Sequence, residues 1–142
     1  MSSRRIVSLS VEETRAAGAL LAGSLSAGDV LGLVGELGAG KTEFVRGLVE
    51  KLNVSARVRS PSFALLNTYD TDRFPVYHFD FFRLTDSSEL SEIGFDEYVR
   101  SQGVCLVEWA DMFPEVLPPQ TRRIAFTDPG DGSRVIDMQE PG

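Results

Sequence analysis

The segment Gly35-Glu36-Leu37-Gly38-Ala39-Gly40-Lys41-Thr42 constrains the fold of this chain more than any other part of the sequence. It matches the Walker A pattern, in which glycines, a lysine and a threonine recur at set positions. Glycines allow the backbone to close around an anion, and a helix that starts there favours negative charge. We therefore expect a loop that binds the phosphates of a nucleotide, formed by Gly35, Leu37, Gly38, Ala39, Gly40, Lys41 and Thr42.

The residues on either side of this loop have the patterns of a buried strand and of a helix. Val30–Val34 is a continuous apolar run of strand length, as expected for a strand covered on both faces of a parallel sheet. Apolar residues then recur on one face between Phe44 and Leu52, which predicts a helix from Lys41 to Asn53. Strand, loop and helix stand in the order that a P-loop requires.

The N-terminal residues predict an edge strand followed by a helix. Ile6–Leu9 is a short apolar stretch suited to an edge strand. Ser10 stands three residues before Glu13, the spacing of a capping box, in which each side chain takes a free amide of the first turn. Apolar residues at every fourth position from Ala17 to Leu25 then predict a helix with one apolar stripe.

Two more strands and a closing hairpin complete the predicted fold. Val76–Phe81 and Val104–Val107 have strand patterns, and the stretch between them fits one helix, or two helices broken near Gly94. Ile124–Thr127 and Val135–Met138 flank a turn rich in glycine and aspartate, which predicts an antiparallel hairpin. We therefore expect one α/β P-loop NTPase domain over residues 1–142, with a mostly parallel central sheet, helices on both faces and an antiparallel C-terminal hairpin.

Two acidic residues end apolar strands, and we expect both at the ligand edge of the sheet. Glu108 follows the more hydrophobic run, which makes it the stronger candidate for holding magnesium together with the Thr42 hydroxyl. Asp80 would orient the attacking water or sense the γ-phosphate, and its role as base, water holder or switch anchor stays open. The predicted catalytic residues are Lys41, Asp80 and Glu108.

The single histidine and the single tryptophan adjoin these acids. His78 shares a strand face with Asp80, and we interpret it as a core histidine bonded to the backbone or to a carboxylate, rather than as a catalytic residue. Trp109 follows Glu108 directly and is interpreted as packing near the nucleotide, where its fluorescence would report ligand binding.

Composition and charge exclude several classes of protein. The net charge of −7 argues against a domain that grips nucleic acid with its whole surface, because phosphate neutralisation needs clustered Lys and Arg. Cys105 is the only cysteine, so no intrachain disulfide forms. We find no signal-type N-terminus and no apolar run of membrane-spanning length, and we therefore expect a cytoplasmic protein.

Four segments together resemble the bacterial TsaE (YjeE) family, from about residue 6 to residue 138. Members of this family are small P-loop ATPases needed for the threonylcarbamoyl modification of the adenosine beside the anticodon in tRNA. The Walker A segment alone is shared with many families, whereas the other three segments are much more specific. The four segments are Gly35–Thr42, Ser60–Phe63, His78–Arg83 and Leu106–Trp109.

The resemblance implies a role for each residue that matches the family pattern. Lys41 and Thr42 would contact phosphate and magnesium, Glu108 would be the acidic metal partner, and Asp80 an acid essential for activity. Ser62 would belong to a switch-like loop near the γ-phosphate.

Further expectations rest on the same resemblance. Ser62 replaces the usual threonine and keeps its hydroxyl, whereas Phe82 replaces the usual tyrosine and lacks one. By analogy, Arg134 and residues near Ser10 would pack on the nucleotide base. The implied cofactors are ATP and Mg²⁺, and hydrolysis is expected to be slow without partners. The implied partners are the TsaB and TsaD proteins, which catalyse the transfer and through which tRNA is reached.

Three other functions are compatible with a P-loop. A small-molecule kinase would need an arginine-bearing lid, and the one run long enough, Thr85–Gly103, contains a single arginine, Arg100. A GTPase would need an Asn/Thr-Lys-x-Asp motif, and the sequence has none. A nucleotide-gated interaction module with incidental hydrolysis is the nearest alternative.

Overall fold

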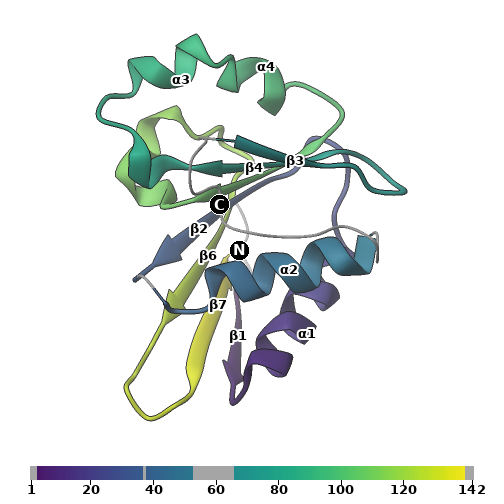
Figure 1. The fold of residues 1–142 in the computed structure, drawn as a ribbon, viewed down its shortest axis with the longest axis vertical. Helices are drawn as coiled ribbons and strands as arrows, with labels where there is room; N and C mark the ends of the chain where they lie inside the picture. Colours follow the sequence, from purple (N-terminus) through teal and green to yellow (C-terminus); the bar gives the residue numbers. More distant parts are fainter. Residues whose placement is uncertain (1–2, 37, 53–65, 140–142) are drawn as a thin grey trace.

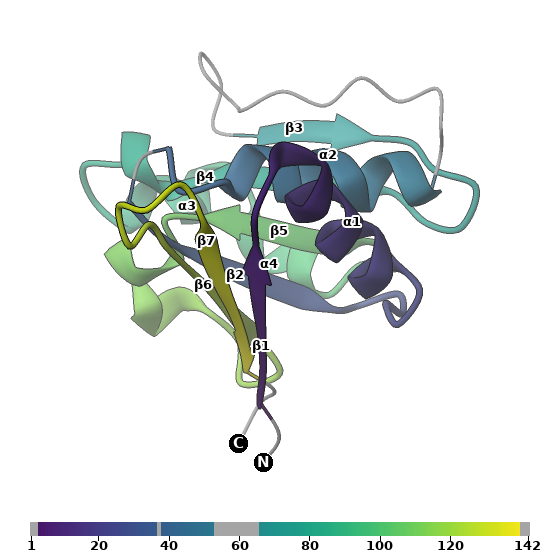
Figure 2. The same ribbon diagram turned by 90° about the horizontal axis from the view of Figure 1, so that it is seen from below.

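A mixed sheet runs through the fold in the computed structural model, which describes residues 3–36, 38–52 and 66–139 (Figures 1 and 2). Its strands are β1 (Ser3–Ser8), β2 (Val30–Gly35), β3 (Leu66–Tyr69), β4 (Val76–Asp80), β5 (Val104–Glu108), β6 (Arg122–Thr127) and β7 (Arg134–Gln139). Their order across the sheet is β1-β7-β6-β2-β5-β4-β3. Strands β6, β2, β5 and β4 run parallel to one another, whereas β1, β7 and β3 pair antiparallel with their neighbours. The predicted parallel centre and antiparallel C-terminal hairpin are confirmed.

Helices cover both faces of the sheet, as predicted (Figure 1). Helices α1 (Val11–Ala22) and α2 (Lys41–Leu52) lie on one face, and α3 (Ser88–Glu92) and α4 (Phe95–Val99) lie on the other. Three short 3₁₀ helices follow strands β4 and β5: η1 (Phe81–Arg83), η2 (Ala110–Met112) and η3 (Pro114–Val116). None of the described helices has both the length and the apolar character needed to span a bilayer.

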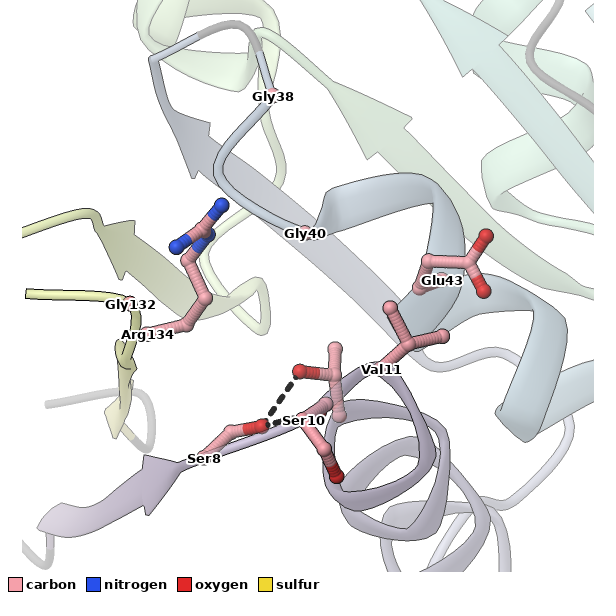
Figure 3. Close-up of a pocket in the computed structure, with 9 residues that line it drawn as sticks. Ser8, Ser10, Val11, Gly38, Gly40, Glu43, Gly132 and Arg134 are labelled. Atoms are coloured by element: carbon pink, nitrogen blue, oxygen red, sulfur yellow. Dashed lines mark hydrogen bonds between the residues drawn. The ribbon is translucent and has the colours of Figure 1, made fainter.

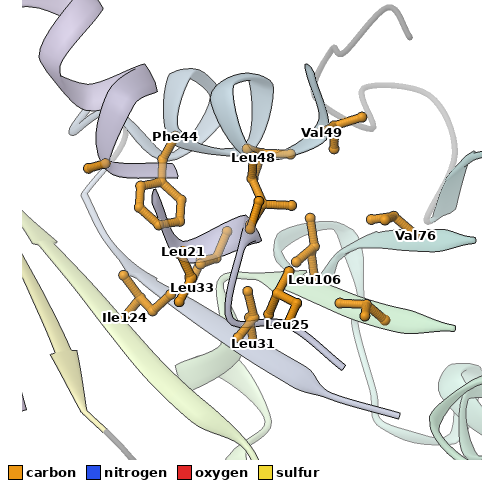
Figure 4. Packing of buried hydrophobic residues seen from close by; sticks show 14 of the residues in the cluster. Leu21, Leu25, Leu31, Leu33, Phe44, Leu48, Val49, Val76, Leu106 and Ile124 are labelled. Atoms are coloured by element: carbon orange, nitrogen blue, oxygen red, sulfur yellow. The ribbon is translucent and has the colours of Figure 1, made fainter. Parts of the chain in front are cut away.

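The central strands are apolar on both faces because each face packs against a helical layer. Leu31, Leu33, Leu106 and Ile124 lie beneath the Phe44 side of α2 (Figure 4). The alternate residues of the same strands belong to a second buried cluster on the side of α3 and α4. Alternation along a strand explains this division, since successive side chains point to opposite faces. The continuous apolar runs of the sequence therefore mark the middle of the sheet.

Helices α1 and α2 approach each other closely through two glycines. A Cβ at Gly18 would overlap the carbonyl oxygen of Phe44, and a Cβ at Gly47 would overlap that of Arg15. Beside this contact, Arg15 Nε donates to a carboxylate oxygen of Glu43 at 2.6 Å. The packing therefore brings the first turn of α1 next to the start of α2, where the Walker A loop ends.

The predicted capping box at the start of α1 forms, but one of its two hydrogen bonds involves a different backbone amide. The Ser10 hydroxyl accepts from the Glu13 amide at 3.1 Å, and the Glu13 carboxylate accepts from the amide of Leu9 at 3.0 Å, not from that of Ser10. The expected apolar stripe extends beyond the helix, since α1 ends at Ala22 while Leu25 stays buried. The strand β1 also ends one residue before the predicted Leu9.

Strand β4 is shorter than predicted, the helical region after it matches one of the two expected alternatives, and strand β3 is an addition to the predicted fold. Strand β4 stops at Asp80, because its side chain accepts from the Phe82 amide at 3.0 Å and starts the helix η1. The helical region after β4 forms two helices, separated at Gly94, which is one of the two expected alternatives. The edge strand β3 was not predicted. The predicted end of α2 at Asn53 lies outside the described residues.

Candidate functional site

The loop between β2 and α2 has a backbone conformation that its glycines permit. Gly35, Gly38 and Gly40 have φ angles of 143°, 80° and 105°, a region that residues with a Cβ rarely adopt. The amide of Phe44 donates to the Gly40 carbonyl at 3.0 Å, so α2 begins directly where the loop ends. The loop therefore opens into the N-terminus of a twelve-residue helix. Leu37, one of the predicted loop residues, lies outside the described residues.

Lys41, the first residue of α2, folds back over the loop. Its Nζ donates to the backbone oxygen of Gly35 at 2.7 Å. The same Nζ lies 3.5 Å from the centroid of the Trp109 ring, a cation–π contact. Lys41 is only 5% exposed, which is unusual for a lysine. The ammonium group is therefore held inside the site by the loop and by an aromatic face.

The charge of Lys41 is balanced by acidic neighbours. Burial lowers the pKa of the Lys41 ammonium, and the negative charges of Glu108, Asp111 and Asp80 oppose that shift. Both predicted acids are thus close enough to Lys41 to act on its protonation. Asp111, on η2, is a third acid that the sequence patterns did not indicate.

Asp80 and Glu108 stand side by side at the carboxyl edge of the sheet. They are register partners across the parallel strands β4 and β5. Asp80 is half-buried, whereas Glu108 is 5% exposed. The sequence predicted this edge for both residues from the strands that precede them. Lys41, Asp80 and Glu108 therefore lie together, at the end of the sheet where the glycine loop also lies.

The only histidine joins Glu108 to a third strand. His78 is fully buried, and its Nε2 lies 2.6 Å from Glu108 Oε2. Its Nδ1 lies 3.0 Å from the hydroxyl of Tyr69 on β3. The interpretation of His78 as a core histidine bonded to a carboxylate is confirmed. Tyr69 was not singled out from the sequence, because the strand that carries it was not predicted.

A pocket of about 160 Å³ opens beside the loop (Figure 3). Arg134 reaches into it from β7, and its guanidinium donates to the Ser133 carbonyl at 2.9 Å and pairs with Asp128 at 3.4 Å. Arg134 thus shares a pocket with the loop glycines Gly38 and Gly40, and its contact with the nucleotide base stays a prediction. The lining comes from β1, α1, the loop, α2 and the C-terminal hairpin: Ser8, Ser10, Val11, Thr14, Gly38, Gly40, Glu43, Gly132 and Arg134.

The inner wall of this pocket contains a buried pair of hydroxyl groups. Ser8 and Thr14 lie 2.7 Å apart through their side-chain oxygens, and Ser8 also donates to the Ser10 carbonyl at 2.8 Å. Ser10 was expected near the base by analogy, whereas Ser8 and Thr14 were not singled out. The sequence carries no direct signal for them, because their place depends on how α1 packs against α2.

The structure describes some of the remaining predicted site residues, but not all of them. Thr42 follows Lys41 in the first turn of α2 and is half-buried, and Ala39 is buried at the end of the loop. Ser62, and with it the predicted switch-like loop, lies outside the described residues.

The donor set suits magnesium held together with a phosphate ligand. Thr42, Asp80 and Glu108 offer hydroxyl and carboxylate oxygens, the hard donors that Mg²⁺ prefers. Within the described part of the chain, no group of three or more His, Cys, Asp or Glu side chains is arranged to hold a metal.

The fold and this loop define a class of proteins: mixed α/β domains in which a Walker A segment joins a central parallel strand to a helix. Within that class the sequence matches a family described as "Threonylcarbamoyl adenosine biosynthesis protein TsaE" over residues 8–136. This chain therefore belongs to the TsaE family.

Individual relatives agree with this assignment over most of the chain. A protein of Bacillus subtilis named "tRNA threonylcarbamoyladenosine biosynthesis protein TsaE" is 44% identical over 131 residues, which cover 92% of this chain and 82% of the relative. A protein of the same name from Treponema pallidum is 38% identical over 94% of this chain and 98% of the relative. The crystal structure of YdiB from Bacillus subtilis has a TM-score of 0.86 and 37% identity, and covers 99% of this chain and 87% of that one.

Proposed function

We propose that this chain binds Mg-ATP, hydrolyses it slowly, and acts with TsaB and TsaD in the threonylcarbamoyl modification of tRNA. The observation that carries the proposal is the position of Lys41. Its ammonium group lies between the carbonyl of the glycine loop and the acidic edge of the sheet, where Asp80 and Glu108 are register partners. That arrangement brings two kinds of group to one place: a cation that can bind phosphates, and carboxylates that can bind a metal ion or a water molecule.

Each residue has a defined task in this proposal. The loop amides and Lys41 bind the phosphates, and Lys41 exchanges its bond to Gly35 for phosphate oxygens. Thr42 and Glu108 hold the magnesium ion, which neutralises charge on the phosphates when it is bound. Asp80 orients the attacking water, since it is the register partner of Glu108 at the same edge of the sheet.

The pocket beside the loop supports adenine as the base. Arg134 offers a planar guanidinium for stacking, and the hydroxyl groups of Ser8 and Thr14 offer hydrogen bonds on the inner wall. The sequence lacks the Asn/Thr-Lys-x-Asp motif of GTPases, which favours ATP over GTP.

Family membership supports the pathway, and the surface charge supports the division of labour. The relatives are named for threonylcarbamoyladenosine biosynthesis in tRNA. A protein with a net charge of −7 is poorly suited to hold tRNA by itself, which favours contact through partner proteins. We therefore assign the transfer step to the partners, and ATP-dependent turnover of their assembly to this chain.

The direct test measures phosphate release from ATP, with and without a purified TsaB–TsaD complex. We expect slow release by the protein alone and a stimulation of about tenfold or more by the complex. Glu108→Gln should abolish the stimulated rate, whereas Glu97→Gln, on the exposed face of α4, should leave it intact. No stimulation would remove the pathway assignment and leave an ATPase. A phosphorylated small acceptor instead of free phosphate would favour a kinase.

A second candidate function, a nucleotide-gated interaction module, is favoured by one observation. Phe82 is 59% exposed, and its ring packs against Trp109 with centroids 4.9 Å apart. Trp109 in turn contacts the Lys41 ammonium. An exposed aromatic side chain is therefore connected to the phosphate lysine through a single residue. ATP-dependent binding of TsaB–TsaD that persists in the hydrolysis-deficient Glu108→Gln variant would favour this function.

A further inference from the structure

We infer that His78, supported by Tyr69, is a positioning residue for the Glu108 carboxylate. The inference deepens the proposed function and rests on it, since it concerns how the acid is presented to the metal and the nucleotide. It starts from a chain of polar contacts that crosses three adjacent strands in an otherwise apolar part of the sheet.

The three residues come from β3, β4 and β5, which are neighbours in the sheet. The Tyr69 hydroxyl lies 3.0 Å from His78 Nδ1, and His78 Nε2 lies 2.6 Å from Glu108 Oε2. All three side chains are buried, with exposed fractions of 7%, 0% and 5%. Val76 on β4 and Leu106, the register partner of His78 on β5, are fully buried as well. Polar groups in such surroundings are costly unless each one is paired, and here both ring nitrogens are paired.

Hydrogen-bond chemistry decides which group donates at each of these contacts. An ionised carboxylate only accepts, so His78 must carry a proton on Nε2 to bond Glu108. The neutral ring then has a lone pair on Nδ1, which the Tyr69 hydroxyl meets as a donor. The Glu108 carboxylate thus selects the tautomer of His78, the Tyr69 hydroxyl holds the ring in that tautomer, and His78 in turn fixes the orientation of the carboxylate. The same logic applies to metal sites, where a second group orients each ligand.

The two carboxylate oxygens of Glu108 therefore have different roles. Among the described residues, the side-chain hydrogen bond recorded for Glu108 is the one that its Oε2 accepts from His78 Nε2. The other oxygen, Oε1, is then the one available to a metal ion or its water. The charge of Glu108 also acts on Lys41, so its position affects both sides of the phosphate site. Losing the bond to His78 would let the carboxylate rotate toward Lys41.

Three variants separate a positioning role from a purely structural one. His78→Leu removes the donor, His78→Gln restores an N–H at the position of Nε2, and Tyr69→Phe removes only the distant hydroxyl. The Tyr69→Phe variant also keeps the inference testable if His78→Leu fails to fold. For each variant we would measure ATP affinity in EDTA by the fluorescence of Trp109, then Mn²⁺ affinity of the ATP complex by electron paramagnetic resonance.

We expect ATP affinity in EDTA to stay within about twofold, while Mn²⁺ affinity falls about tenfold or more in His78→Leu and recovers in His78→Gln. Tyr69→Phe should give a smaller loss of the same kind. Unchanged Mn²⁺ affinity in folded His78→Leu or in Tyr69→Phe would overturn the inference, as would a failure of glutamine to restore it.

A measurement on the free protein gives a readout that does not depend on the metal. Nitrogen-15 spectra of the imidazole ring should show the proton of His78 on Nε2. A proton on Nδ1 alone would overturn the inference. Failure of the unmodified protein to bind ATP would overturn the proposed function itself, and that result is distinct from any effect of these variants.

Discussion

The Nζ of Lys41 lies 3.5 Å from the centre of the Trp109 ring while it donates to the Gly35 carbonyl. Trp109 adopts a left-handed backbone conformation with φ of 58°, which it alone has among the described non-glycine residues. Such strain costs about 1–3 kcal/mol and persists where the surroundings impose it. The structure therefore holds the Lys41 cation against an aromatic face, and in the proposed function the binding of phosphate changes that contact.

The first prediction concerns the fluorescence of Trp109, the only tryptophan. Titration with Mg-ATP should change the emission in a saturable way, because the ammonium group beside the indole moves toward phosphate. The half-saturation point should agree with the dissociation constant from calorimetry. Heat of binding without any change in emission would contradict the contact between Lys41 and Trp109.

Two glycines offer a matched test of the loop. Gly38 and Gly130 have φ angles of 80° and 93°, and a Cβ at either would meet nothing within 4 Å. Alanine at either position should therefore cost about 1 kcal/mol of stability through backbone strain alone. Only Gly38→Ala should weaken ATP binding, since Gly130 lies in the tip of the hairpin. Equal ATP affinity in the two variants would argue against the loop as the site.

Arg134 tests the base pocket separately from the phosphates. Arg134→Ala should lower the affinity for ATP about tenfold, because a stacked cation contributes roughly 1 kcal/mol or more. Its affinity for inorganic triphosphate should stay unchanged. Arg5→Ala is the control, since it removes an exposed cation that pairs with Asp137 at 2.7 Å on the neighbouring strand. A parallel loss for both ligands would place Arg134 at the phosphates instead.

Cys105 gives a prediction about pH. Burial raises the pKa of its thiol from 9.0 to about 12. Between these values the unfolded chain loses the proton while the folded protein keeps it, so stability should fall as pH rises above 9. At pH 8 the thiol should react with a disulfide reagent only after unfolding in urea. Rapid reaction of the native protein would show that the thiol is accessible.

The loop and its flanks could be predicted from the sequence because their signals are local. The Walker A pattern needs eight consecutive residues, and the flanking strand and helix follow from periodicity. The edge position of Asp80 and Glu108 followed from the strands that they end. Their direct opposition did not, since the register between β4 and β5 depends on the whole sheet.

The parts that could not be predicted depend on contacts distant in the chain. Strand β3 has only four residues, and Asn67 and Thr68 interrupt its apolar pattern. It forms through antiparallel pairing with β4, and only then does Tyr69 reach His78. The pocket of Ser8 and Thr14 likewise requires α1 to pack on α2, which local patterns do not reveal.

The measurement that tests the central claim most directly is calorimetric titration of Mg-ATP into the unmodified protein and into Lys41→Met. Methionine keeps an unbranched, flexible side chain of nearly the same length and removes the ammonium group, together with its contact to Trp109. The unmodified protein should bind one ATP per chain, and Lys41→Met should bind at least about 30-fold more weakly. The free energy of unfolding of Lys41→Met should stay within about 1 kcal/mol of that of the unmodified protein. The variant loses the contacts of the ammonium group, but it also loses the cost of burying a charge. Equal affinity of the two proteins for Mg-ATP would contradict the assignment of this loop as the nucleotide site.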